Sequence, residues 1–264
     1  MKNLLIALSA IAITLSSCRK IIDIELEEGD KKTVIEANLY EGNNDFRVKI
    51  TKTGNFFGDN SPVIIDNATV NLSDGTSTFP LIYSGNGNYF LVGFTAVSGT
   101  EYTLNVDENG NSFEAKATMP VGVDIDTISY AFVAASAFND EGYVTQLEFF
   151  DPGSVNNFYR IEVDIAGEFY GGISDLILLD DGFLDGNRIE FPLFGIDVAQ
   201  LGDNVTMNLL TTDESTFKYL EGIDEVLGGG NGAPPANPKG NFSNGAIGNF
   251  NVYVKDTQSV TITP

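Results

Sequence analysis

The chain has 264 residues, of which 37 are acidic and 14 basic, and its formal net charge at pH 7 is −23. This acidic excess disfavours nucleic-acid binding, because phosphates are contacted by clustered Lys and Arg. There is no histidine and a single cysteine, which excludes Ser–His–Asp and Cys–His catalysis and the usual zinc sites. We therefore expect a protein that is not an enzyme.

The first segment has the three-part order of a secretory signal peptide. Lys2 precedes an apolar run from Leu4 to Leu15, and two serines stand directly before Cys18. This order resembles the bacterial lipobox, in which the cysteine thiol is acylated and becomes the new N-terminus. The alternative is an ordinary signal peptide followed by a chance cysteine. We expect residues 1–17 to be removed, Cys18 to carry the lipid and residues 18–32 to form an acidic stalk.

Residues 33–120 have the pattern of a β-sandwich. Apolar and polar residues alternate from Phe46 to Ile50, as in a strand with one buried face. Asn109–Gly110 is a strong hairpin signal between two alternating segments. About seven strands at this spacing make a sandwich, and their order suggests a transthyretin-like or immunoglobulin-like module.

Residues 121–264 are predicted to form a second β-rich domain with one short helix, which makes the chain all-β in class. The alternation recurs from Tyr159 to Ile165. The helix is predicted from Asp213 to Leu227, with Thr212 or Asp213 as its N-cap and Gly228 just past its end.

Short turn and strand motifs follow the cysteine along most of the chain: Thr33–Val34–Ile35–Glu36–Ala37, Asp66–Asn67–Ala68–Thr69–Val70, Gly99–Thr100–Glu101–Tyr102, Met119–Pro120 and Asn241–Phe242–Ser243–Asn244. In this order they resemble a Bacteroidetes family of outer-membrane lipoproteins whose shared domain has no assigned function. Members of that family are commonly found beside TonB-dependent receptors. The resemblance implies an accessory or ligand-capturing partner of a TonB-dependent transporter. It also implies a lipid-anchored location in the outer membrane, at the cell surface, with the periplasmic face as the alternative.

Two other functions stay open. A fimbrial or structural surface subunit, assembled by strand addition, has the same kind of anchor and domains. Cleavage near Lys32 or Arg47 would favour that function. A glycan hydrolase with paired carboxylates is the other alternative, but among 37 acidic residues a pair has no meaning by itself.

The densest acidic loop lies at residues 180–187, where Asp180, Asp181 and Asp185 are interleaved with glycines. Carboxylate oxygens on a flexible turn suit Ca²⁺, which takes six to eight oxygen ligands. The spacing differs from that of an EF-hand. Ca²⁺ is thus the candidate cofactor, and a plain solvated hairpin is the alternative.

Two further positions are candidate sites. Phe56 and Phe57 stand between glycines in an expected loop, and exposed aromatic residues are typical contacts for ligands or partners. The alternative is a loop that buries both rings. Asp126–Thr127–Ile128 resembles the three-residue O-glycosylation motif of Bacteroidetes periplasmic proteins, with Thr127 as the acceptor. Thr127 as an ordinary strand residue is the alternative.

Overall fold

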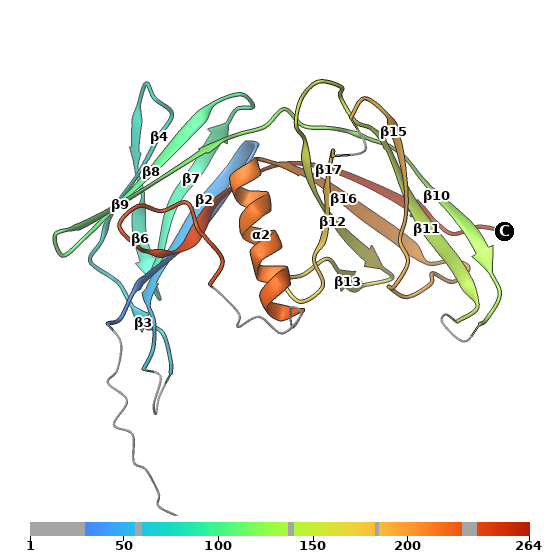
Figure 1. The fold of residues 1–264 in the computed structure, drawn as a ribbon, viewed down its shortest axis with the longest axis horizontal. Helices are drawn as coiled ribbons and strands as arrows, with labels where there is room; N and C mark the ends of the chain where they lie inside the picture. The colour runs from blue at the N-terminus through green and yellow to red at the C-terminus, as the bar shows by residue number, and fades with distance from the viewer. Residues whose placement is uncertain (1–29, 56–59, 137–139, 183–184, 229–236) are drawn as a thin grey trace, which may run out of the picture. The chain divides into compact units, whose positions relative to one another are not determined.

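The computed structural model describes residues 30–55, 60–136, 140–182, 185–228 and 237–264 (Figure 1). Within these residues the chain is mostly β, with three sheets and a single helix. This confirms the predicted fold class. The predicted lipid site Cys18 and the predicted contact residues Phe56 and Phe57 lie outside the described residues.

The largest sheet has ten strands. Eight of them follow one another across the sheet, and the other two pair at its sides. The order is β13 (Glu168–Tyr170), β12 (Phe158–Ile165), β16 (Asn204–Thr212), β17 (Ile247–Thr261), β1 (Thr33–Tyr40), β2 (Gly42–Lys52), β7 (Asn88–Ala96) and β6 (Ile82–Gly85), while β14 (Ile177–Asp180) pairs with β12 and β3 (Val63–Ile64) with β2.

Two smaller sheets accompany it. The four-stranded sheet has the order β5 (Thr78–Pro80), β4 (Thr69–Ser73), β8 (Glu101–Glu108) and β9 (Asn111–Thr118). The three-stranded sheet has the order β10 (Ile125–Val133), β11 (Gly142–Phe150) and β15 (Arg188–Pro192).

The buried apolar side chains form two clusters. One joins the four-stranded sheet to β1, β2, β7 and the first part of β17, and includes Leu72, Leu104 and Phe250. The other joins the three-stranded sheet to β12 and β16, and includes Phe149 and Ile161. Burial of apolar surface on this scale is the main favourable contribution to folding. The first cluster also contains Phe242, Phe250 and Val252, which lie well beyond residue 120, and the predicted domain boundary there stays a prediction.

β17 crosses from one cluster to the other. Residues Ile247–Tyr253 pair in parallel with β1, and residues Tyr253–Thr261 pair antiparallel with β16. Because β1 and β16 come from the two halves of the sequence, β17 makes one continuous sheet of strands from both. Residues Gly248 to Tyr253 are buried without interruption, as expected for a strand covered on both faces.

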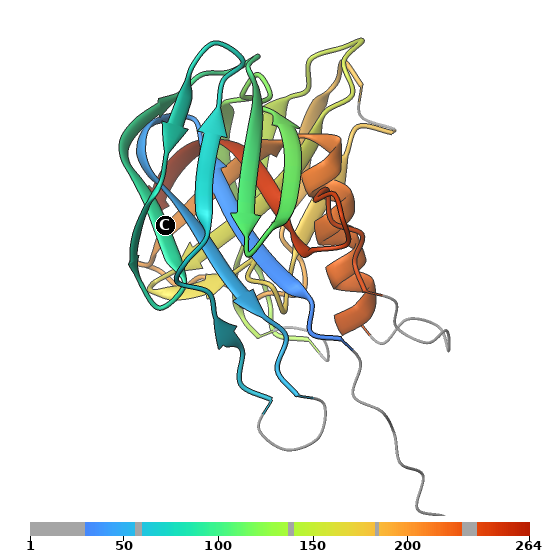
Figure 2. The ribbon, with the colours of Figure 1, turned by 90° about the vertical axis from the view of Figure 1, so that its left-hand side faces the viewer.

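The helix α2 (Glu214–Leu227) begins and ends as the sequence predicted. Asp213 is its N-cap, and its carboxylate accepts a hydrogen bond of 2.9 Å from the backbone N–H of Thr216. The helix packs on β12 and β17, and the Phe217 ring lies 5.1 Å from the ring of Phe158. In the view of Figure 2 the helix, in orange, stands at one side of the strands.

The segment before β17 covers the edge of the four-stranded sheet. The backbone N–H of Ser243 donates to the carbonyl of Glu114 at 2.8 Å, and Glu114 donates to the Ser243 hydroxyl at 2.9 Å. The Asn244 side chain donates to the carbonyl of Ser112 at 2.7 Å. These bonds occupy part of the open side of β9, which would otherwise be available to another strand.

Candidate functional site

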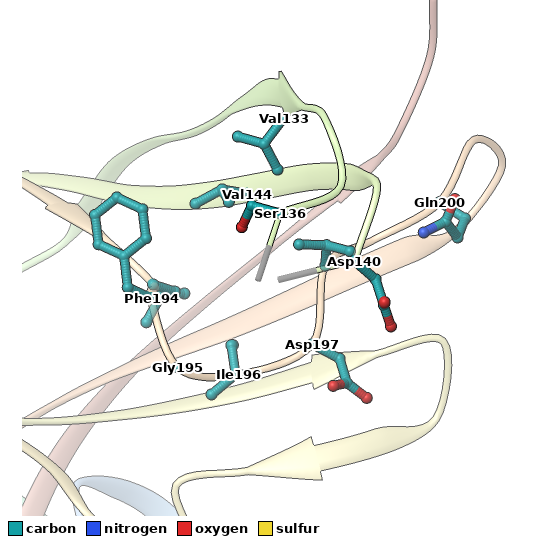
Figure 3. Close-up of a pocket in the computed structure, with 11 residues that line it drawn as sticks. Val133, Ser136, Asp140, Val144, Phe194, Gly195, Ile196, Asp197 and Gln200 are labelled. Atoms are coloured by element: carbon teal, nitrogen blue, oxygen red, sulfur yellow. The ribbon is translucent and has the colours of Figure 1, made fainter. Parts of the chain in front are cut away.

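A pocket of about 840 Å³ lies between the hairpin of β10 and β11 and the segment that follows β15 (Figure 3). Ligand pockets in proteins commonly have volumes of about 300–1,000 Å³. The lining combines apolar side chains with carboxyl, amide and hydroxyl groups. It consists of Val133, Ser136, Asp140, Val144, Leu193, Phe194, Gly195, Ile196, Asp197, Val198 and Gln200.

The pocket exists because the segment after β15 leaves β11 and then returns to it. The backbone N–H of Leu193 donates to the carbonyl of Thr145 at 2.9 Å. Further along, Tyr143 and Ala199 exchange backbone hydrogen bonds of 2.8 and 3.0 Å. Between these two attachments, residues 194–198 bow away from the sheet, and Gly195 has a φ of 87°, which glycine adopts without strain. The bow is therefore fixed at both ends.

The apolar side of the pocket contains an exposed aromatic ring. Phe194 is 75% exposed, and its ring rises from the segment toward the hairpin (Figure 3). Val133, Val144 and Phe194 also line an adjoining hollow of about 210 Å³. An apolar ring of this size on a fixed segment is a typical contact for a ligand or partner.

The opposite side of the pocket is acidic. Asp140 and Asp197 are both exposed, and their carboxylates lie across the pocket from Phe194 (Figure 3). The side-chain amide of Gln200, which also lines the pocket, donates to the carbonyl of Glu141 at 2.9 Å. None of the described residues that line the pocket is Lys or Arg. The pocket thus has one apolar end and one negatively charged end.

The predicted metal residues are brought together only in part. One carboxylate oxygen each of Asp151, Asp181 and Asp185 lies within 4.8 Å of the other two. Asp180 is elsewhere in the loop: it ends β14, and its carboxylate accepts a 3.3 Å hydrogen bond from the N–H of Gly182. Asp151, which the sequence analysis did not select, takes its place.

Hydrogen bonds within the protein already use these carboxylates. Asp151 is fully buried and accepts hydrogen bonds from the Tyr159 hydroxyl and from the N–H of Gly186. Asp181 accepts from the N–H of Asn157 at 3.1 Å, and Asp185 from the N–H of Ser154 at 2.6 Å. Burial and the bond to Asp151 raise the pKa of Tyr159. The cluster joins the β11–β12 connection to the β14–β15 connection, and calcium binding there stays a prediction.

The predicted glycosylation residue lies on a strand. Thr127 is exposed in β10 opposite Glu148 of β11, so its hydroxyl faces solvent and its modification stays a prediction. The residues that the sequence analysis missed had weak local signals. Asp151 begins the turn Asp151–Pro152–Gly153, and Phe194 precedes a glycine soon after a strand.

Comparison with protein families gives one match. A family model described as "Domain of unknown function (DUF4249)" matches residues 19–259. This confirms the part of the resemblance that concerns a shared domain without assigned function over most of the chain. No curated protein matches the chain. No helix within the described ranges is long and apolar enough to cross a membrane.

Proposed function

We propose that the chain, which belongs to the DUF4249 family of unknown function, is a lipid-anchored outer-membrane protein. In this proposal it captures a ligand beside a TonB-dependent transporter. It acts by binding, without enzymatic activity of its own. Its exposed location at the cell surface gives it first access to the ligand, and the transporter receives what it captures.

The observation that carries the proposal is the pocket between the β10–β11 hairpin and residues 193–200. It has a volume of about 840 Å³, and Phe194 at its mouth is 75% exposed. Aromatic side chains that face solvent beside a pocket are typical contacts for ligands and partners. The lining lies on a hairpin and on a segment fixed at both ends, so its shape is largely present before a ligand binds.

The anchor supports the location. Leu15, two serines and Cys18 stand where a lipidated cysteine is expected. One acyl chain gives only marginal membrane binding, at about 0.8 kcal/mol per buried CH₂, whereas two or more hold a protein stably. Confinement to a membrane raises the effective concentration of the chain near a membrane partner, which favours a role beside a transporter.

The fold gives less support to the fimbrial alternative, in which an N-terminal strand is removed and replaced. β1 is paired on both sides, with β17 and with β2. Its side chains Ile35 and Ala37 are at most 1% exposed. Removal of β1 would open the centre of the ten-stranded sheet. The resulting loss of stability would be large compared with the total free energy of unfolding of an ordinary protein.

The test is an affinity purification of the tagged chain from gently solubilised outer membranes of its own organism, read by mass spectrometry. The matched control is Cys18→Ala, which removes the acylated thiol. We expect a TonB-dependent receptor in about stoichiometric amount with the wild-type chain and none with the control. Recovery of the chain alone, or of a ladder of its own multimers, would overturn the proposal and favour the fimbrial alternative.

A further inference from the structure

We propose that the side chains of Lys52 and Asn109 form an intramolecular amide bond, with the buried carboxylate of Glu108 as the acid and base of the reaction. The bond links the end of β2 to the turn between β8 and β9, and so joins the ten-stranded sheet to the four-stranded sheet. It is a modification that the folded chain makes on itself, and it does not depend on the proposed capture function.

The amine and the carboxamide meet at one oxygen atom of a buried acid. Glu108 Oε1 lies 2.7 Å from Lys52 Nζ and accepts a 3.0 Å hydrogen bond from Asn109 Nδ2. The Glu108 side chain is fully buried. A general acid or base exchanges protons over distances of about 2.6–3.2 Å. Glu108 can therefore take a proton from the amine and deliver one to the nitrogen that leaves Asn109.

The carbonyl oxygen of the same carboxamide also has a hydrogen-bond donor. Asn67 Nδ2 donates to Asn109 Oδ1 at 3.0 Å. Asn67 is held in turn by its neighbour Ala68, whose backbone N–H donates to the hydroxyl of the buried Tyr89 at 3.0 Å. A donor at this oxygen polarises the carbonyl and stabilises the negative charge that develops when a nucleophile adds to the carbon. The carboxamide is thus activated at both of its polar atoms.

The strands hold the two reacting groups in place. Lys52 ends β2 and is paired with Thr33 on one side and with Val63 on the other. Asn109 and Gly110 form the two-residue turn after β8, with φ values of 50° and 86°, as such a hairpin requires. Reacting groups that are fixed side by side lose little further entropy on the way to the transition state. The geometry therefore favours reaction between these two side chains.

The reaction exchanges one carbon–nitrogen bond for another. Lys52 Nζ loses a proton to Glu108, and its lone pair forms a bond to Cγ of Asn109. The bond between Cγ and Nδ2 then breaks. Two of the three protons of the lysine ammonium group pass by way of Glu108 to Nδ2, which leaves as ammonium. Glu108 ends as a carboxylate, as it began, and the chain becomes lighter by one ammonia molecule.

The bond changes properties that can be measured. The sequence has one cysteine, so an internal disulfide cannot link its strands. An amide between residues 52 and 109 closes the chain between them into a loop and restricts the unfolded state, as a disulfide does. Lys52 also loses its charge, so the ion pair with Glu108 belongs to the unlinked chain. Linked protein should therefore melt at a higher temperature than unlinked protein.

The test follows the mature lipidated chain by mass spectrometry after purification in the cold and incubation at pH 8. A protease that cleaves at acidic residues cuts the chain at several places between residues 52 and 109, so the two segments stay together only if they are linked. We expect joined peptides whose mass is the sum of both less one ammonia, with fragmentation locating the bond between Lys52 and Asn109. The amount of joined peptide and the melting temperature should rise together with time.

Four variants and one control assign the reaction to these groups. Lys52→Arg keeps a positive charge beside Glu108 without the amine, and Asn109→Gly keeps the turn without the carboxamide. Neither should give joined peptides. Glu108→Gln should slow linking by about a hundredfold or more, and Asn67→Ala by about tenfold or more. Lys49→Arg, on the same strand, should link at the wild-type rate.

A chain that keeps its full mass after prolonged incubation would overturn the proposal. So would a loss of ammonia that persists in Lys52→Arg, because a cyclic imide at Asn109–Gly110 also releases ammonia but does not use the amine. Circular dichroism shows that each variant folds. If Glu108→Gln does not fold, the lysine and asparagine variants still decide whether these two side chains make the bond. None of these outcomes depends on the recovery of a transporter.

Discussion

The ring of Tyr40 stacks on the ring of Tyr253, with centroids 5.3 Å apart and planes inclined at 28°. Tyr253 is also the residue at which β17 passes from pairing with β1 to pairing with β16, since it stands opposite both Tyr40 and Thr212. Burial raises the pKa of Tyr253. The stacked pair therefore lies where the two halves of the chain share one sheet.

The first prediction concerns this junction. Tyr253 is 1% exposed, so Tyr253→Ala should lower the free energy of unfolding by about 3–5 kcal/mol, as for other large buried rings. Tyr83→Ala is the matched control, because Tyr83 is 39% exposed and should cost less than half as much. Urea denaturation followed by circular dichroism measures both. A loss below 1 kcal/mol for Tyr253→Ala would show that the junction is not needed for stability.

The second prediction concerns a buried ion pair. The Glu108 side chain is fully buried, 2.7 Å from Lys52 Nζ, and also accepts from the Thr33 hydroxyl at 3.2 Å. These bonds join the ends of β1 and β2 to β8. We expect Glu108→Gln to lower the free energy of unfolding at pH 7 by about 1–3 kcal/mol, the usual cost of leaving buried polar partners unpaired. Glu221→Gln, in the exposed pair with Lys218, should change it by less than about 0.5 kcal/mol.

The pH dependence of Glu108 follows from the same contacts. Burial raises the pKa of Glu108, but the hydrogen bond and charge of Lys52, with the bonds from Asn109 and Thr33, outweigh it and hold the pKa below its ordinary value. A lowered pKa stabilises the fold above the unfolded-state pKa, about 4.3, and this contribution is lost as the pH falls through the folded-state value. The difference between wild type and Glu108→Gln should therefore shrink on acidification below pH 4. A constant difference from pH 7 to pH 3 would contradict this account.

The third prediction concerns the helix cap. Asp213→Ala removes the acceptor of the Thr216 N–H and should cost about 1 kcal/mol. Burial raises the pKa of Asp213, although the bonds from Thr216 and Thr118 oppose it. A raised pKa means that ionisation weakens the fold as the pH rises above the unfolded-state value, about 3.9.

Asp213→Asn keeps the acceptor and removes the charge, so at pH 7 it should be at least as stable as the wild type. Denaturation at pH 3 and pH 7 compares the three proteins. Equal losses for the Asn and Ala variants would show that the charge, rather than the acceptor, caps the helix.

The fourth prediction separates the pocket from the core. Phe194 is 75% exposed, whereas Phe149 is fully buried and lies 5.0 Å from the ring of Tyr159. Phe194→Ala should change the free energy of unfolding by less than about 0.5 kcal/mol and so leave the melting temperature nearly unchanged. Phe149→Ala should cost about 3–5 kcal/mol. A large loss of stability for Phe194→Ala would indicate that the ring packs against the rest of the protein and is not available to a ligand.

Strands with one buried face could be predicted from the sequence, because the period of two residues is a local signal. The segment from Phe46 to Ile50 lies in β2, and the segment from Tyr159 to Ile165 lies in β12. The turn at Asn109–Gly110 has positive φ at both residues, as the hairpin motif requires. The helix N-cap could likewise be predicted to within one residue, as Thr212 or Asp213, because capping depends on the residues next to the helix start.

The parallel pairing of β1 with β17 could not be predicted, because its partners are far apart in sequence. The Asn251 side chain donates to Asn38 at a separation of 213 residues. Burial of β17 on both faces also removes the alternation that marks a half-buried strand. Gly248, at a φ of 104°, lets the backbone of β17 lie close to β1, because a Cβ atom at this position would collide with the carbonyl of Ile35. A single glycine in the sequence does not indicate which strand its own strand pairs with.

The candidate sites show the same limit. The acidic loop could be recognised at Asp181 and Asp185, but Asp151 reaches them only through the pairing of β11 with β15. The pocket around Phe194 depends on where the segment after β15 leaves β11 and where it returns. Composition and spacing contain no signal for that geometry.

Native mass spectrometry of the complex released from outer membranes tests most directly the proposed role of the lipid-anchored chain beside a TonB-dependent receptor. We expect one species whose mass is that of one receptor plus one mature chain, and which disappears in Cys18→Ala. Masses equal to the mature chain alone or to its multiples, with no receptor, would contradict it.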